Sequence, residues 1–204
     1  MSSEPHPFEE YLTRLRAALA GINLGALDAG VNALMDCYHA GGAVFVIGNG
    51  GSASTATHMA CDLSKGPTPA DKQGLVVWSL TDNPALLTAL ANDLAFDEIF
   101  AQPILARMKS CDLLIAISAS GNSPNLVKGL QAARRKGCKV MALTGFKGGY
   151  LAQEADIVLH ASGETYGPVE DVHLIVNHYF VEAVRLRLAG EAREIGIGRA
   201  KLQK

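Results

Sequence analysis

Five short apolar segments alternate with helical patterns along this chain, and this alternation limits its fold more than any other feature. The segments that we predict as strands are residues 43–47, 75–80, 113–118, 139–143 and 157–160. They are apolar almost without a break, which is typical of parallel strands whose two faces are both covered. We therefore expect an α/β fold: a five-stranded parallel sheet flanked by helices, doubly wound and flavodoxin-like.

Helical patterns fill the intervals between these segments. Residues 8–19 carry Leu12, Leu15 and Leu19 at a spacing that places them on one helix face. The helices predicted in this way are residues 8–19, 26–38, 52–64, 84–94, 123–136 and 170–188. A chain of 204 residues has the size of one domain. We expect a single domain over residues 1–204, with N-terminal helices over 8–39, a core over about 40–189 and a polar tail over 190–204.

The charge and the cysteines of the chain limit its partners and its location. Eighteen Lys and Arg residues are balanced by 20 Asp and Glu residues, which gives a net charge of −2 and no excess of basic residues for nucleic acid. The four cysteines lie far apart without a C-x-x-C pair, so we expect reduced thiols. No apolar run approaches the ~20 residues that cross a bilayer, and the N-terminus lacks the apolar segment of a signal peptide. We expect a cytoplasmic protein with no nucleic-acid or membrane partner.

Two of the predicted strands end in loops rich in Gly and Ser that lead into helices. The first is residues 47–52, Ile-Gly-Asn-Gly-Gly-Ser, and the second is residues 118–123, Ser-Ala-Ser-Gly-Asn-Ser. Glycine lets the backbone approach a ligand closely, and the helix that follows offers free N–H groups to an anion. Neither loop is a Walker A sequence or a strict dinucleotide fingerprint. Either loop alone is also compatible with an ordinary turn, but two of them at the carboxyl ends of strands favour an anionic ligand.

Two groups of His and acidic residues lie on predicted helices. His58 and Asp62 are four residues apart, which places them on one helix face. The second group, at the start of the last helix, comprises Glu170, Asp171, His173 and His178. Each group by itself is compatible with ordinary hydrogen bonds or a charged helix end. Together they offer two His nitrogens and two carboxylate oxygens, a ligand set that suits zinc or a similar divalent ion.

These motifs, in this order and spacing, resemble the sugar isomerase (SIS) domain family, and within it the phosphoheptose isomerase branch. The resemblance extends over about residues 8–189 and is carried by residues 47–63, 90–93, 118–125, 143–145 and 170–178. Gly-Asn-Gly-Gly-Ser and Ser-Gly-Asn-Ser are typical of the family, and the His-x-x-x-acid helix with the last-helix His narrows the resemblance to that branch. It implies a homotetramer with sites at subunit interfaces, which leaves open whether Asp62 and His178 meet within one chain or across two.

The resemblance also implies roles for individual positions. The implied substrate contacts are Asn49, Gly50, Gly51, Ser52, Asp62, Asn92, Asp93, Ser118, Ala119, Ser120, Ser123 and Glu170. The implied metal ligands, for one Zn²⁺ per subunit site, are His58, Asp62, Glu170 and His178. The implied catalytic residues are Asp62, as general base, and His178, as acid. Glu170 is the alternative base, because it also lies in the implied metal shell.

Three positions depart from the usual family pattern. Asp62 replaces Glu, and its shorter side chain requires a shifted sugar or a shifted helix for proton abstraction at the same carbon. Glu170 replaces Gln, which adds a negative charge to the implied metal shell and strengthens the binding of a divalent cation. Ala119 replaces Thr and loses a hydroxyl but keeps its backbone N–H, so we expect phosphate binding to survive.

The activity that the resemblance implies is an aldose–ketose isomerisation through an enediol. It converts sedoheptulose 7-phosphate to D-glycero-D-manno-heptose 7-phosphate and supplies heptose for bacterial surface glycans, lipopolysaccharide or capsule. Two other classes of function remain open: a non-catalytic binding protein, similar to the replication-initiator-associating protein that shares this fold, and a sugar-phosphate sensor. The acid and the His of the implied site favour the enzyme, because a scaffold requires neither. The sensor ranks third, because 204 residues leave no room for a helix-turn-helix module beside the sugar domain.

Overall fold

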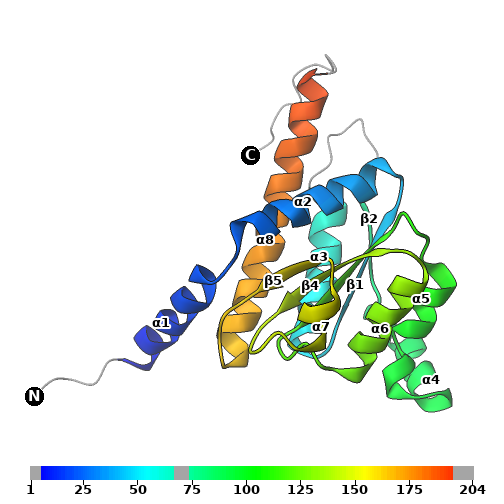
Figure 1. Ribbon diagram of the computed structural model, residues 1–204, viewed down its shortest axis with the longest axis horizontal. Helices are drawn as coiled ribbons and strands as arrows, with labels where there is room; N and C mark the ends of the chain where they lie inside the picture. Colours follow the sequence, from blue (N-terminus) through cyan, green and yellow to red (C-terminus); the bar gives the residue numbers. More distant parts are fainter. Residues whose placement is uncertain (1–5, 67–73, 195–204) are drawn as a thin grey trace, which may run out of the picture.

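A parallel sheet of five strands forms the centre of the computed structural model, which describes residues 6–66 and 74–194 (Figure 1). Its strands lie in the order β2-β1-β3-β4-β5. Their bounds are β1 (Ala43–Gly48), β2 (Val76–Ser79), β3 (Leu113–Ser118), β4 (Lys139–Thr144) and β5 (Ile157–His160). All five predicted strands are present, and the predicted α/β fold is confirmed. The strand order reverses between β1 and β3, which is where open α/β sheets bind ligands beyond the carboxyl ends of their strands.

Helices connect the strands and lie on both faces of the sheet. Their bounds are α1 (Pro7–Ala20), α2 (Leu24–His39), α3 (Gly51–Lys65), α4 (Pro84–Asp93), the 3₁₀ helix η1 (Phe96–Glu98), α5 (Ala101–Arg107), α6 (Pro124–Arg135), α7 (Gly149–Glu154) and α8 (Tyr166–Glu194). Periodicity does not predict α5, α7 and η1, because elements of about two turns or fewer are too short to show it. Helix α8 is longer than predicted and includes the first residues of the expected tail; residues 195–204 lie outside the described residues.

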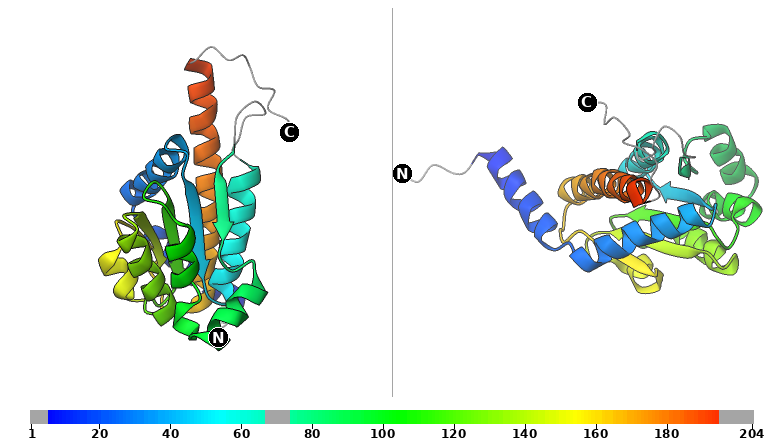
Figure 2. Two further views of the ribbon diagram at one scale, coloured as in Figure 1. Left: turned by 90° about the vertical axis from the view of Figure 1, so that its right-hand side faces the viewer. Right: turned by 90° about the horizontal axis from the view of Figure 1, so that it is seen from above.

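Helices cover both faces of the sheet (Figure 2), and each face has its own hydrophobic core. On one face, α2, α3 and α8 bury Leu34, Met59 and Phe180 against the strands. On the other face, α5 and α6 bury Ile104 and Leu130. Successive residues of a strand point to opposite faces, so a run of apolar residues is needed to fill both cores. This explains the nearly continuous hydrophobicity of the strands in the sequence.

The N-terminal helices pack on the side of the sheet that carries α8 (Figure 1). Helix α1 contacts the start of α8, where the Tyr11 hydroxyl donates to Asp171 Oδ2 over 2.5 Å. This hydrogen bond raises the pKa of Tyr11. In the described part of the chain, no single helix is long and apolar enough to cross a membrane; only α1 and α2 taken together, which are bent by 70°, meet that requirement of length and composition.

Candidate active site

The loops that leave β1 and β3 are tied to each other by a pair of amide side chains. Asn49 Nδ2 donates to Asn125 Oδ1 over 2.9 Å, and Asn125 Nδ2 donates to Asn49 Oδ1 over 2.8 Å. Asn125 lies in the first turn of α6 and is buried. The sequence predicts no role for Asn125. Its place at the end of the motif of residues 118–125 was the feature of the sequence that could have indicated one. The amide pair fixes the first Gly-rich loop against the start of α6.

Both loops lead into helices whose N-termini lack a side-chain cap. Gly50 precedes α3 and Ser123 precedes α6, and neither residue provides a capping hydrogen bond from its side chain. Gly50 has φ +53°, in the left-handed region that favours glycine. The first N–H groups of an uncapped helix and its dipole attract anions. This geometry supports the anion-binding role predicted for the two loops.

The loop after β3 is held in a tight conformation by hydrogen bonds among its own residues. Ser118 Oγ accepts a hydrogen bond from Gly121 N over 3.0 Å and lies 3.4 Å from Ser120 Oγ. Gly121 has φ +66°, and a Cβ atom at this position would collide with the carbonyl oxygen of Gly148. Ser120 and Ser123 are partly exposed beside the start of α6. The loop therefore places its hydroxyl groups at a helix N-terminus, as a phosphate site requires.

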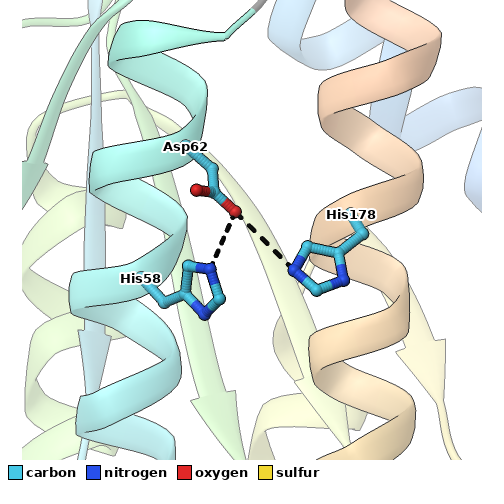
Figure 3. A group of neighbouring side chains, drawn as sticks. All are labelled: His58, Asp62 and His178. Carbon is cyan, nitrogen blue, oxygen red and sulfur yellow. Dashed lines mark ion pairs between the residues drawn. The ribbon is translucent and has the colours of Figure 1, made fainter.

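Three of the four predicted metal ligands meet between α3 and α8 (Figure 3). His58 Nε2 lies 3.0 Å from Asp62 Oδ2, and His178 Nε2 lies 3.8 Å from the same oxygen. The two imidazole rings are in edge-to-face contact, with centroids 5.2 Å apart. One possible ligand atom from each residue lies within 4.8 Å of the other two. Asp62 and His178 thus meet within one chain, and no second subunit is needed to bring them together.

The donor set of this triad fits a divalent cation. Two imidazole nitrogens and one carboxylate oxygen are typical ligands of catalytic zinc, which keeps a further coordination position open for water or substrate. The His58 and His178 side chains are about half exposed, and that of Asp62 is 27% exposed. The triad is therefore accessible to a small molecule.

Glu170, the fourth predicted ligand, lies apart from this triad. Its carboxylate packs on Gly51 in the first turn of α3, so closely that a Cβ atom on Gly51 would collide with both carboxylate oxygens. Glu170 and His178 are eight residues apart on α8, which corresponds to about 12 Å along a helix. The structure therefore places Glu170 beside the first Gly-rich loop, where it is a candidate for substrate contact rather than for joining the three metal ligands.

The predicted pair Asn92 and Asp93 is exposed at the end of α4. Asn92 Nδ2 donates to Asp93 Oδ1 over 2.9 Å. Among the described residues, no side-chain hydrogen bond connects either residue to the two loops or to the triad. Their role in substrate binding stays a prediction.

Two polar residues at the start of α8, Asp171 and His173, have structural contacts rather than a place in the triad. His173 is buried, and its Nε2 donates to the backbone carbonyl of Thr144 over 3.1 Å. Burial lowers the pKa of His173 to about 4, so the ring is neutral near pH 7. Asp171 binds Tyr11 of α1. These two residues anchor α8 to β4 and to α1, and neither joins the triad.

Comparison with known proteins agrees with the motifs and with the fold. The SIS domain family matches residues 8–145, which is more than half of the chain. The chain belongs to the SIS domain family. The phosphoheptose isomerase of Rhodospirillum rubrum is 40% identical over 139 residues, which cover 68% of this chain and 73% of that protein. The phosphoheptose isomerase of Geobacter sp. strain M21 is 33% identical over 186 residues, covering 88% and 96%.

A solved structure shows the same relationship. The phosphoheptose isomerase of Neisseria gonorrhoeae superposes on this SIS domain with a TM-score of 0.79 at 27% identity, over 86% of this chain and 95% of that one. The predicted family is thus confirmed. In this SIS domain the three residues that depart from the family pattern lie in different places: Asp62 is in the triad and Glu170 is beside Gly51. Ala119 is a buried member of the loop of residues 118–123, the serine loop, and its carbonyl accepts from Gly145 N over 3.1 Å.

Proposed function

We propose that this SIS domain is a phosphoheptose isomerase, which interconverts sedoheptulose 7-phosphate and D-glycero-D-manno-heptose 7-phosphate. The observation that carries the proposal is the triad of His58, Asp62 and His178, which combines a carboxylate and imidazoles on two adjacent helices. The Gly- and Ser-rich loops in the same domain supply the features of a phosphate site. The phosphoheptose isomerase of Rhodospirillum rubrum, which is 40% identical to this chain over 139 residues, supports the same activity.

The reaction requires a base and an acid on the two carbons that exchange the carbonyl group. We assign Asp62 as the base that removes the carbon-bound proton and His178 as the acid that protonates the opposite carbon or its oxygen. The contacts of the Asp62 carboxylate with His58, His178 and Asn177 all involve Oδ2. Oδ1 is therefore the oxygen with lone pairs available for the proton. The loop of residues 118–123 binds the phosphate and so fixes the sugar relative to this base.

The triad is also the proposed metal site. His58, Asp62 and His178 would hold one Zn²⁺ ion per site, and such an ion supplies Lewis-acid stabilisation of negative charge on the sugar oxygens. Glu170 would adjust the charge near the first loop from its position on Gly51.

The wider setting of the enzyme is also part of the proposal. We expect a homotetramer in the cytoplasm that supplies heptose phosphate for lipopolysaccharide or capsule. The exposed side chains of Ile175, Tyr179 and Leu186 on α8 support an assembly, because apolar groups of this size are candidates for burial against another subunit.

A direct assay separates the enzyme from a non-catalytic binding protein and from a sensor. The purified protein is incubated with sedoheptulose 7-phosphate, with and without Zn²⁺, and the aldose product is measured. We expect product in the presence of the metal and its loss after chelation. A protein that binds the sugar phosphate but forms no product under either condition would instead be a sensor or an adaptor.

A further inference from the structure

Asn177 is a buried polar residue of α8 that contacts the triad and was not predicted from the sequence. Its side chain is fully buried, and its Nδ2 donates to Asp62 Oδ2 over 3.1 Å. A carboxylate oxygen can only accept, so the amide must present its nitrogen to Asp62. We propose that Asn177 is a positioning residue, which holds the Asp62 carboxylate between the two histidines; this role rests on the proposed function of the triad.

Packing alone does not account for an amide at this position. Apart from His173, which has the Thr144 carbonyl as its partner, the other buried residues described on α8 are apolar, and they include Val176, Phe180 and Val184. Asn177 Oδ1 is buried and, among the described residues, has no hydrogen-bond partner. Burying an unsatisfied amide oxygen costs stability, so an apolar side chain of similar volume would suit the core better. What the amide provides, and an apolar side chain could not, is the hydrogen bond to Asp62.

The geometry of Asp62 explains why such a partner matters. Asp62 is one methylene shorter than the Glu usual in the family, and its reach from α3 toward α8 is correspondingly small. Its Oδ2 is 3.0 Å from His58 on the same helix but 3.8 Å from His178 on α8, beyond hydrogen-bonding distance. At 3.1 Å, Asn177 supplies the hydrogen bond from α8 to this oxygen. Without it, among the residues that the structure describes, the side-chain contact left to Asp62 Oδ2 within hydrogen-bonding distance is the one to His58, four residues away on α3.

The first test replaces Asn177 with an apolar residue of similar volume. For Asn177→Leu we expect kcat to fall about 10–100-fold and the dissociation constant for Zn²⁺ to rise by a similar factor, the usual effect of losing a partner of a metal ligand. KM for the sugar phosphate should stay within about twofold, because the serine loop is untouched. The midpoint of thermal unfolding should not fall, because the substitution removes a buried unsatisfied oxygen.

The matched control is Val184→Ala, which removes methyl groups from the same buried stripe of α8 two turns further on. It should lower the unfolding midpoint while leaving kcat and the zinc dissociation constant unchanged. A second variant pairs Asn177→Leu with Asp62→Glu. The longer acid reaches α8 without the amide, so the cost of losing Asn177 should be smaller in that background.

Three results would overturn the inference. The first is an unchanged kcat and zinc affinity in Asn177→Leu, and the second is a fall in kcat that is explained by a lower unfolding midpoint. The third is that Asn177→Leu reduces kcat by the same factor in the Asp62→Glu background as in the parent. Failure of the proposed function is distinguishable, because then the parent itself forms no product. In that case zinc titration and crystal structures of the metal-free parent and of Asn177→Leu still decide the question. We expect the Asp62 carboxylate to leave its position in the variant; the same single rotamer in both proteins would contradict the role of Asn177.

Discussion

The serine loop after β3 and the triad between α3 and α8 are built in opposite ways. The loop is fixed through backbone groups of Gly121: its N donates to the side-chain Oγ of Ser118, and its O accepts from Leu151 N. The triad consists of three side chains from two helices, and a single oxygen of Asp62 lies at its centre. We therefore expect the loop, which combines backbone groups with several hydroxyl groups, to tolerate the loss of one side chain better than the triad tolerates the loss of one of its three members.

The largest effect is expected at the centre of the triad. Asp62→Asn should reduce kcat by about 10²–10⁴-fold, because an amide cannot accept the carbon-bound proton. The unfolding midpoint and the binding of the sugar phosphate should change little, because the carboxylate is partly exposed and the loop is separate. Steady-state kinetics and calorimetric titration measure these quantities.

Loss of a metal ligand would imitate the loss of a base, so zinc content is measured on the same samples. His58→Ala is the matched control, since it removes a ligand but leaves the proposed base. Asp62→Asn with full zinc content and no turnover would support Asp62 as the base. Normal turnover of Asp62→Asn would exclude Asp62 as the base. It would also contradict the expectation that the triad is more sensitive to substitution than the serine loop.

The second prediction is a loss of stability at low pH, caused by His173, which joins α8 to β4. His173 has its pKa lowered from 6.5 to about 4 by burial, so the folded protein holds this ring neutral. Between about pH 6.5 and pH 4 the unfolded chain binds a proton that the folded chain does not, so stability falls as the pH decreases through this window. The full contribution is at most about 3 kcal/mol.

Urea unfolding between pH 7 and pH 4 measures this loss. His173→Gln, which keeps a donor for the Thr144 carbonyl but does not titrate, should flatten the pH dependence. Hydrogen exchange should show α8 losing protection at low pH before the loop of residues 118–123. An equal slope in parent and His173→Gln would show that another group causes the pH dependence.

A smaller effect is expected in the serine loop. Ser120→Ala should weaken binding of the sugar phosphate by about 1.5–3 kcal/mol, the range for one hydrogen bond to a charged group. Ser120 Oγ accepts one hydrogen bond within the loop, from Asn122 N over 3.3 Å. The fold should nevertheless persist, because Gly121 N still donates to Ser118 Oγ and Gly121 O still accepts from Leu151 N. Ser64→Ala, an exposed serine on α3, serves as the control. Equal affinity of Ser120→Ala and the parent would remove Ser120 from the phosphate site.

The sequence predicted the loops of the site better than the side chains around the triad. The loops were predictable because the carboxyl ends of parallel strands lie at one edge of a sheet, and Gly and Ser mark the positions where a strand ends. His58 and Asp62 were predictable from their spacing on one helix. Asn177 was not, because a polar residue within an apolar helical pattern does not reveal which neighbouring helix its side chain will contact.

The position of Glu170 shows a second limit of the sequence. Its spacing from His178 places both residues on roughly one side of α8, but the pattern does not fix which part of α3 each one faces. In the structure α3 and α8 run in the same direction: Glu170 lies against Gly51, and Val181 lies against Gly66 at the other end of α3. Glu170 therefore faces the first turn of α3, whereas His178 faces the turns that carry His58 and Asp62. Only the packing of the two helices determines this separation.

The smallest effect is expected for Glu170→Gln, which restores the residue usual in the family. The substitution keeps the shape of the side chain on Gly51 and removes a negative charge near the N-terminus of α3, a contact worth about 0.3–1 kcal/mol of stability. Zinc affinity should stay close to that of the parent, because Glu170 is not part of the triad, and most of the turnover should remain. Metal titration, urea unfolding and steady-state kinetics on parent and variant check the three expectations. A large loss of zinc would place Glu170 in the metal shell after all, and an inactive Glu170→Gln beside an active Asp62→Asn would transfer the role of the base to Glu170.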